Sequence, residues 1–149
     1  MNRQWRGQVG DPTGLGAALA AEYAAVFAYG PIGVQLRGTQ AQAAREAEDV
    51  HRARRDAVLL TLAARGIDPP PAEATYQLPF PVTNADQACR LAALVEDRVA
   101  AVWRAVLPAV AAEDRRDALE ALMDAAVRAT RWRLAAGVEP AITAFPGID

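Results

Sequence analysis

The residues best suited to chemistry lie in "REAEDVHRARRD", residues 45–56, which contains the single histidine of the 149-residue chain. His51 follows Glu48 by three residues, and side chains three apart lie on one face of a helix, so both can point at one ion. Helical bundles that bind two iron or manganese ions use such Glu-x-x-His pairs together with carboxylates from other helices. The spacing therefore indicates a metal site, although charged helices often contain it by chance.

Three further carboxylates lie near the middle of predicted helices. The separation of Glu22 from Glu48 is 26 residues, and that of Glu96 from Asp124 is 28, so these side chains are expected at similar depths in a bundle. The last helix supplies the site poorly, because Val127 stands where a second histidine would follow Asp124. The candidate metal ligands are Glu22, Glu48, His51, Glu96 and Asp124.

Arginine offers a different way to satisfy the same carboxylates. Arg55 follows His51 by one helical turn, and Arg128 and Arg131 follow Asp124. A buried carboxylate beside a guanidinium needs no metal, because the fork of N–H groups matches the carboxylate oxygens. The alternatives are therefore a bound metal, a network of Glu, His and Arg side chains, and a solvated helix surface.

The buried face of the helix that carries His51 is ambiguous in the sequence. One apolar stripe runs through Ala43, Ala47, Val50, Ala57 and Val58, with Arg54 in its middle. A second stripe runs through Ala44, Glu48, His51, Arg55, Leu59 and Leu62 and would turn Glu48 inward. Alanine is tolerated on either face, so the pattern does not choose between the two stripes.

The aromatic residues have a simpler expected role. Tyr23, Phe27 and Tyr29 are predicted to pack in the core or between helices, and Trp103 and Trp132 to pack under neighbouring segments. A tyrosine beside a di-metal centre could serve radical chemistry, and a pocket could open near Phe27 and Tyr29. Packing is the simplest account of the whole set.

Glycine and proline divide the chain into four helical stretches. They span about residues 15–36, 39–65, 83–107 and 118–136. Pro31 lacks the N–H that would bond the carbonyl of Phe27, so a kink or break is expected there. Asp86 is expected at the capping-box position of the third stretch.

The segment between the second and third stretches, "IDPPPAEATYQLPFPV", contains five prolines and cannot be helical. A helix of about 26 residues is about 39 Å long, and an extended connection of about 17 residues reaches about 55 Å. The connection can therefore run the full length of a bundle. Two antiparallel hairpins joined by one long crossover match the connectivity of ferritin-type four-helix bundles.

Composition supports an all-α protein and excludes several classes of partner. Alanine, the best helix former, accounts for 36 of the 149 residues. The chain has 18 acidic residues and 16 basic ones, and all the basic ones are arginine. This balance favours neither nucleic acid nor an anionic membrane as a partner.

No signal peptide or membrane-spanning run is expected, and one cysteine, Cys89, fits a reducing compartment, so a cytoplasmic location is predicted. One domain, residues 1–149, has an N-terminal arm at 1–12 and an irregular tail at 138–149.

The chain resembles the ferritin-like domain of unknown function found in alanine-rich hypothetical proteins of actinobacteria. The likeness covers the chain from about Gly14 and rests on "AAEYAAVFAYG", "EDVHRARRDA", "YQLPFPVT", "VEDRVAAVWR", "AVRATRWR" and "FPG". The resemblance implies a four-helix bundle and no established activity. It also implies a di-iron pattern at Glu22, Glu48, His51 and Glu96, from which the last helix departs at Val127.

Two functions remain open at this point. The first is a non-catalytic, self-associating bundle, expected to be a dimer, in which a network including Arg55, Arg128 and Arg131 replaces the metal. The second is an iron- or manganese-binding protein with oxidase-like activity, a non-haem iron oxidoreductase. A small-molecule-binding bundle is a third possibility.

Overall fold

The computed structural model describes residues 13–148, and over that range it consists of four α-helices and one 3-10 helix, without a β-strand. The elements are α1 (Leu15–Gln35), α2 (Gly38–Ala64), α3 (Ala85–Val106), η1 (Ala112–Asp114) and α4 (Arg115–Ala135). The prediction of an all-α helical bundle is confirmed. The predicted N-terminal arm lies outside the described residues.

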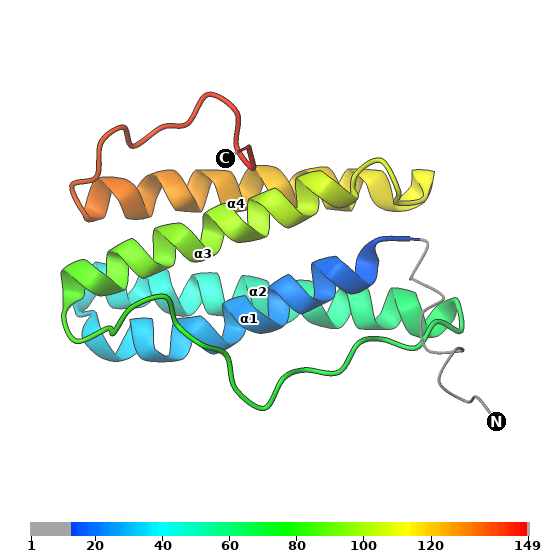
Figure 1. Ribbon diagram of the computed structural model, residues 1–149, viewed down its shortest axis with the longest axis horizontal. Helices are drawn as coiled ribbons and strands as arrows, with labels where there is room; N and C mark the ends of the chain where they lie inside the picture. The colour runs from blue at the N-terminus through cyan, green and yellow to red at the C-terminus, as the bar shows by residue number, and fades with distance from the viewer. Residues whose placement is uncertain (1–12, 149) are drawn as a thin grey trace.

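The four helices form two layers (Figure 1). Helices α1 and α2 make one antiparallel hairpin, and α3 and α4 make the other. The connection 65–84 runs back along the outside of the bundle, beside α1, so that α3 begins at the same end as α2 (Figure 1). Side chains from the middle of all four helices therefore meet at one level.

Small side chains allow the helices to approach closely. Helix α4 packs against α3 and buries alanines at helical spacing: Ala118, Ala121, Ala125 and Ala129, each at most 1% exposed. Larger side chains fill the space between layers, among them Leu19, Ile32, Leu62 and Leu91, which are also at most 1% exposed. Burial of these faces is the main source of stability for helices of this length.

Helix α1 continues through Pro31, so of the kink or break expected there, the break does not occur. Proline removes one intrahelical hydrogen bond, but the turn after it carries Ile32 and Leu36, which are 0% and 1% exposed. The burial of these two side chains favours continuation of the helix and offsets the lost bond.

Helix α2 buries a face that lies between the two stripes found in the sequence. Its buried residues are Ala44, Ala47, His51, Val58 and Leu62. His51 therefore faces the core, whereas Glu48 and Arg55 lie at its edge with side chains 25% and 24% exposed.

Asn84, rather than Asp86, begins the capping structure of α3. The Asn84 side chain accepts the backbone N–H of Gln87 at 2.9 Å, and the Gln87 side chain in turn accepts the N–H of Thr83 at 2.9 Å. Asp86 instead pairs with Arg90 one turn later.

Replacement of Asn84 by alanine is expected to lower the free energy of unfolding by about 1 kcal/mol, because a backbone N–H loses its acceptor. Urea denaturation measures the change. Asn84→Asp keeps an acceptor and serves as the control. An unchanged midpoint for Asn84→Ala would show that the cap contributes nothing.

The irregular tail runs back over the α3–α4 layer (Figure 1). Arg133 holds its start, since its guanidinium forms an ion pair with Asp97 and donates to the Ala141 carbonyl at 3.1 Å. Gly147, with φ of 78°, lies so close to α3 that an added Cβ would be 3.0 Å from the Ala100 carbonyl oxygen. The tail is therefore packed on the bundle at both of these points.

Helix α1 is long and apolar enough to cross a membrane by length and composition, contrary to the expectation that no segment would be. A core helix of a soluble protein passes the same test. Here α1 buries Leu15, Leu19 and Ile32 in the bundle and carries the buried carboxylate of Glu22.

Candidate functional site: a buried ionic network

The centre of the bundle holds a histidine between two carboxylates. His51 of α2 lies with Nδ1 2.6 Å from Oε2 of Glu22 on α1 and with Nε2 3.0 Å from Oε1 of Glu96 on α3. All three residues are 0% exposed. Three helices thus contribute one charged side chain each to a single chain of hydrogen bonds.

This arrangement favours the protonated form of His51. A neutral imidazole can donate from only one ring nitrogen, whereas the imidazolium donates from both, as two carboxylate partners require. Burial by itself would lower the pKa of His51, but the hydrogen bonds to Glu22 and Glu96 and the attraction of their charges raise the pKa above 6.5. The network therefore contains a buried cation flanked by two anions.

Aromatic side chains also donate to the two glutamates, to the second oxygen of Glu22 and to the same Glu96 oxygen that His51 contacts. Trp103 donates its indole N–H to Oε1 of Glu22 at 2.6 Å, and Tyr29 donates its hydroxyl to Oε1 of Glu96 at 2.6 Å. Trp132 donates to the Tyr29 hydroxyl at 3.0 Å. Burial, together with the neighbouring Glu96 charge, raises the pKa of Tyr29 well above 10.0, so this phenol remains a donor.

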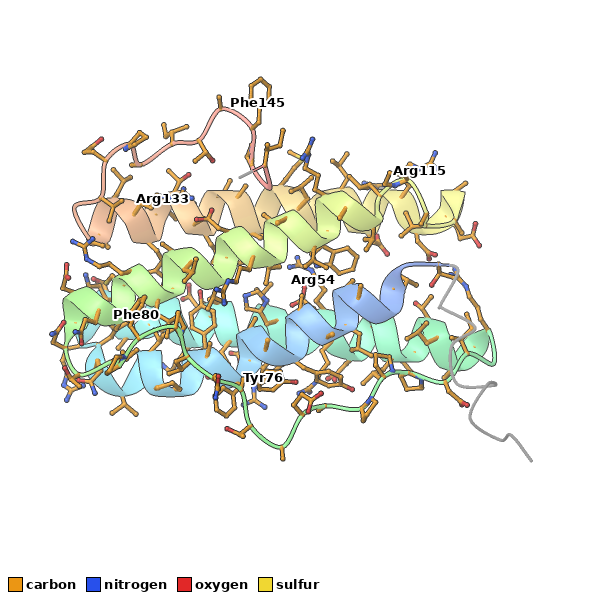
Figure 2. All side chains as sticks on the ribbon, in the orientation of Figure 1. Arg54, Tyr76, Phe80, Arg115, Arg133 and Phe145 are labelled. Carbon is orange, nitrogen blue, oxygen red and sulfur yellow. The ribbon has the colours of Figure 1, made fainter. Side chains whose placement is uncertain are left out.

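Arginines extend the network from the core towards α4. Arg128 donates Nε to Oε1 of Glu96 at 2.9 Å and Nη1 to Asp124 at 2.5 Å, and its side chain is 11% exposed. Arg54 of α2 donates to the same oxygen of Asp124 at 3.1 Å. Figure 2 shows Arg54 near the middle of the bundle, where α2 faces α4.

The charges of this network balance. Three carboxylates, those of Glu22, Glu96 and Asp124, alternate with three cations, those of His51, Arg128 and Arg54. Burial would raise the pKa of Glu96, but His51 and then Arg128 lower it below its ordinary value of 4.5. Alternating charges compensate the desolvation that each would suffer alone.

The structure brings together only some of the residues singled out in the sequence. Glu22, His51 and Glu96 meet in the core, and Arg128 and Asp124 join them. Glu48 pairs instead with Arg52, Arg55 pairs with its neighbour Asp56, and Arg131 is exposed on α4.

These residues do not fit a di-metal centre. Both ring nitrogens of His51 are bonded to carboxylates, and Oε1 of Glu96 already accepts from Tyr29, His51 and Arg128. Glu48 pairs with Arg52 instead, and the second Glu96 oxygen, Oε2, is buried without a hydrogen-bond partner within residues 13–148. One unpartnered carboxylate oxygen does not make the ligand set of a di-metal centre. Within residues 13–148, no group of three or more His, Cys, Asp or Glu side chains is arranged to hold a metal ion.

Four members of the network were not among the site residues predicted from the sequence: Tyr29, Arg54, Trp103 and Trp132. A signal was present for two of them, because Tyr29 follows Glu22 by seven residues and Trp103 follows Glu96 by seven. Residues two turns apart share a helix face, and buried indole and phenol groups require a hydrogen-bond partner. The expectation of simple packing overlooked this requirement.

Stability is expected to be greatest between about pH 4.5 and 6.5. The pKa of His51 is raised on folding, so its contribution is complete below 6.5 and is lost as the pH rises through the folded-state pKa. The pKa of Glu96 is lowered, so its contribution is complete above 4.5 and is lost as the pH falls. Urea denaturation at a series of pH values tests this; a flat profile above pH 6.5 would contradict it.

Asp124, at the α4 end of the network, has a side chain that is 46% exposed, but the centre of the network is sealed from solvent, which limits the chemistry there. Its central carboxylates and imidazole are 0% exposed, so no substrate reaches them in this arrangement. Every charged side chain of the network has an ion-pair partner, although Glu96 Oε2, Arg54 Nη1 and Arg128 Nη2 are buried without a hydrogen bond within residues 13–148. A paired group of this kind orients helices and specifies how they pack.

Comparisons with known proteins place the chain in a family. Residues 14–149 match the family described as "Domain of unknown function (DUF4439)". The crystal structure of a conserved hypothetical protein, rv2844, from Mycobacterium tuberculosis is 40% identical, with a TM-score of 0.80, over 86% of this chain and 99% of that one. The comparison with curated proteins gave no match. This chain therefore belongs to the DUF4439 family of domains of unknown function.

Proposed function

We propose that this protein is a cytoplasmic, non-catalytic bundle of ferritin-like ancestry that self-associates, and in which a network of Glu, His and Arg side chains replaces a di-metal centre. The observation that carries the proposal is the pairing of both His51 ring nitrogens with carboxylates, together with Arg128 on Glu96. The guanidinium and imidazolium supply the positive charge that two metal ions would supply in a carboxylate-rich bundle.

Metal analysis tests the replacement. Untagged protein is incubated with iron, manganese or zinc salts, passed through a gel-filtration column and analysed for bound metal. We expect well below one equivalent. One or more equivalents would contradict the proposal and favour the alternative, an iron- or manganese-binding protein with oxidase-like activity.

Glu48 provides the discriminating variant. A di-metal site would use Glu48, whereas the network does not. The Glu48 side chain is partly exposed, and its partner within residues 13–148 is Arg52. Glu48→Ala is therefore expected to fold normally and to leave metal content unchanged. If Glu48→Ala removed a stoichiometric metal from the protein, the replacement of the metal by the network would be wrong.

An exposed apolar strip on α4 supports self-association. Leu119, Met123 and Val127 follow at four-residue intervals and are 45%, 59% and 49% exposed. Phe145 and Ile148 of the tail, 70% and 50% exposed, line a hollow of about 400 Å³ together with Met123 and Val127. Contiguous apolar patches of this kind on a surface mark association sites, and a second copy is the occupant we propose.

Analytical ultracentrifugation of the untagged protein tests this second part of the proposal. A dimer is expected, and Met123→Glu is expected to convert it to monomer because a charge enters the apolar strip. Leu60→Glu, at a 73% exposed leucine of α2 outside the strip, is the matched control and should remain dimeric. A monomeric wild-type protein would contradict self-association, but it would not contradict the replacement of the metal by the ionic network.

A further inference from the structure

An apolar hollow of about 310 Å³ lies between α1, α3 and the long connection, apart from the ionic network. Its floor is made of small residues of α1, including Ala21, Ala24 and Ala28, which leave room that larger side chains would fill. Tyr76 of the connection covers one side and packs against Phe27, with ring centroids 5.3 Å apart. Figure 2 shows Tyr76 on the connection alongside α1.

Few polar groups line this hollow, and each of them can donate a hydrogen bond. Arg98 is the one charged side chain among the described residues that line it, and it makes no hydrogen bond or ion pair within residues 13–148. Gln77 also lines the hollow and is unpaired within that part of the chain. The Tyr76 hydroxyl accepts the N–H of Glu73 at 3.1 Å, which leaves its own proton free to donate. An anionic group is complementary to these donors.

Sites for small ligands combine an apolar lining of this kind with a few polar groups, so a small ligand with an apolar chain and a polar end matches the hollow.

We propose that this hollow binds the anion of a straight-chain carboxylic acid, with the hydrocarbon along Ala21, Ala24 and Val102 and the carboxylate at Arg98. The proposal goes beyond the ionic network and does not depend on it. Arg98 is exposed, so its charge contributes modestly, while the apolar slot contributes most of the affinity.

Isothermal titration calorimetry with dodecanoate, below its micelle concentration, tests the proposal on the full-length protein. Saturable binding of one molecule per chain is expected. Arg98→Ala should weaken it about 3- to 10-fold, since a charge-assisted hydrogen bond is lost at a partly screened site. Arg90→Ala, on the exposed surface of the same helix and outside the hollow, is the matched control and should bind like the wild type.

Two further measurements test where the hydrocarbon chain of the ligand lies and whether its negative charge contributes to binding. Ala24→Leu fills the floor and should weaken dodecanoate binding more than Arg98→Ala does, while its urea denaturation curve shows that it folds. Dodecyltrimethylammonium, with the same chain and the opposite charge, should bind more weakly than dodecanoate. Absence of saturable binding, equal affinity for the two probes, or insensitivity to Ala24→Leu would each overturn the proposal.

Discussion

His51→Ala is expected to lower the free energy of unfolding by about 3–5 kcal/mol, which is a large part of the stability of a domain of this size. Removal of the imidazolium leaves the Oε2 oxygen of Glu22 buried without its 2.6 Å partner and removes one of the two cations beside Glu96. A cavity in a fully buried position adds to the loss. Urea denaturation near pH 6, where the imidazolium contributes in full, measures the change.

A double-mutant cycle separates the ionic effect from the cavity. Glu22→Gln removes the anion that His51→Ala leaves uncompensated, so the double variant should be more stable than the sum of the two single changes implies. Additive effects would mean that His51 stabilises the bundle by packing alone. Such a result would also contradict the pH profile expected above 6.5.

Arg128→Met is expected to lower the free energy of unfolding by a comparable amount, about 3–5 kcal/mol. The substitution removes the guanidinium from its ion pair with Glu96 and leaves the buried carboxylate of Glu96 in place. Arg128 joins Glu96 to Asp124 by two hydrogen bonds from different guanidinium nitrogens. Methionine conserves much of the length and apolar character of the side chain, so the loss reflects charge and hydrogen bonding. Urea denaturation again provides the measurement.

Two variants make the interpretation specific. Arg128→Lys keeps the charge but lacks the fork that reaches both carboxylates, so an intermediate loss is expected. Arg52→Met breaks the exposed pair with Glu48, whose partners are 49% and 25% exposed, and should change stability by less than about 1 kcal/mol. If Arg128→Met were no more destabilising than Arg52→Met, the central place of Arg128 in the network would be refuted.

The helices of this protein are largely readable from local features. Gly66 and Gly137, both at positive φ, follow α2 and α4 closely, and the proline-rich connection prevents any helix between α2 and α3. Local rules allowed either a kink or a break at Pro31, and tertiary burial of Ile32 and Leu36 keeps α1 continuous. Local rules hold where nothing else acts on the backbone, and burial overrides them where the backbone lies in the core.

The candidate site was only partly readable. Glu22, His51 and Glu96 were identified as candidate metal ligands, from the Glu-x-x-His spacing and from carboxylates placed at similar depths in the middle of the helices. Glu48 and Arg55 were assigned to the same site, yet both lie at its edge and pair with neighbours on their own helix. Arg54, Tyr29 and the two tryptophans complete the network in the structure instead.

Breakers and helix formers along the chain specify the number and order of the helices and the depth at which the acidic residues and the histidine lie along them. The rotation of α2 about its axis, and therefore which charges meet, follows from the packing of the helices against one another. The reason is the alanine content of α2. Alanine buries little apolar area, so two rotations of α2 about its axis that bury different alanines differ little in burial free energy. The pairing of His51 with two carboxylates from α1 and α3 requires one particular rotation, and that requirement is visible only once three helices are packed together.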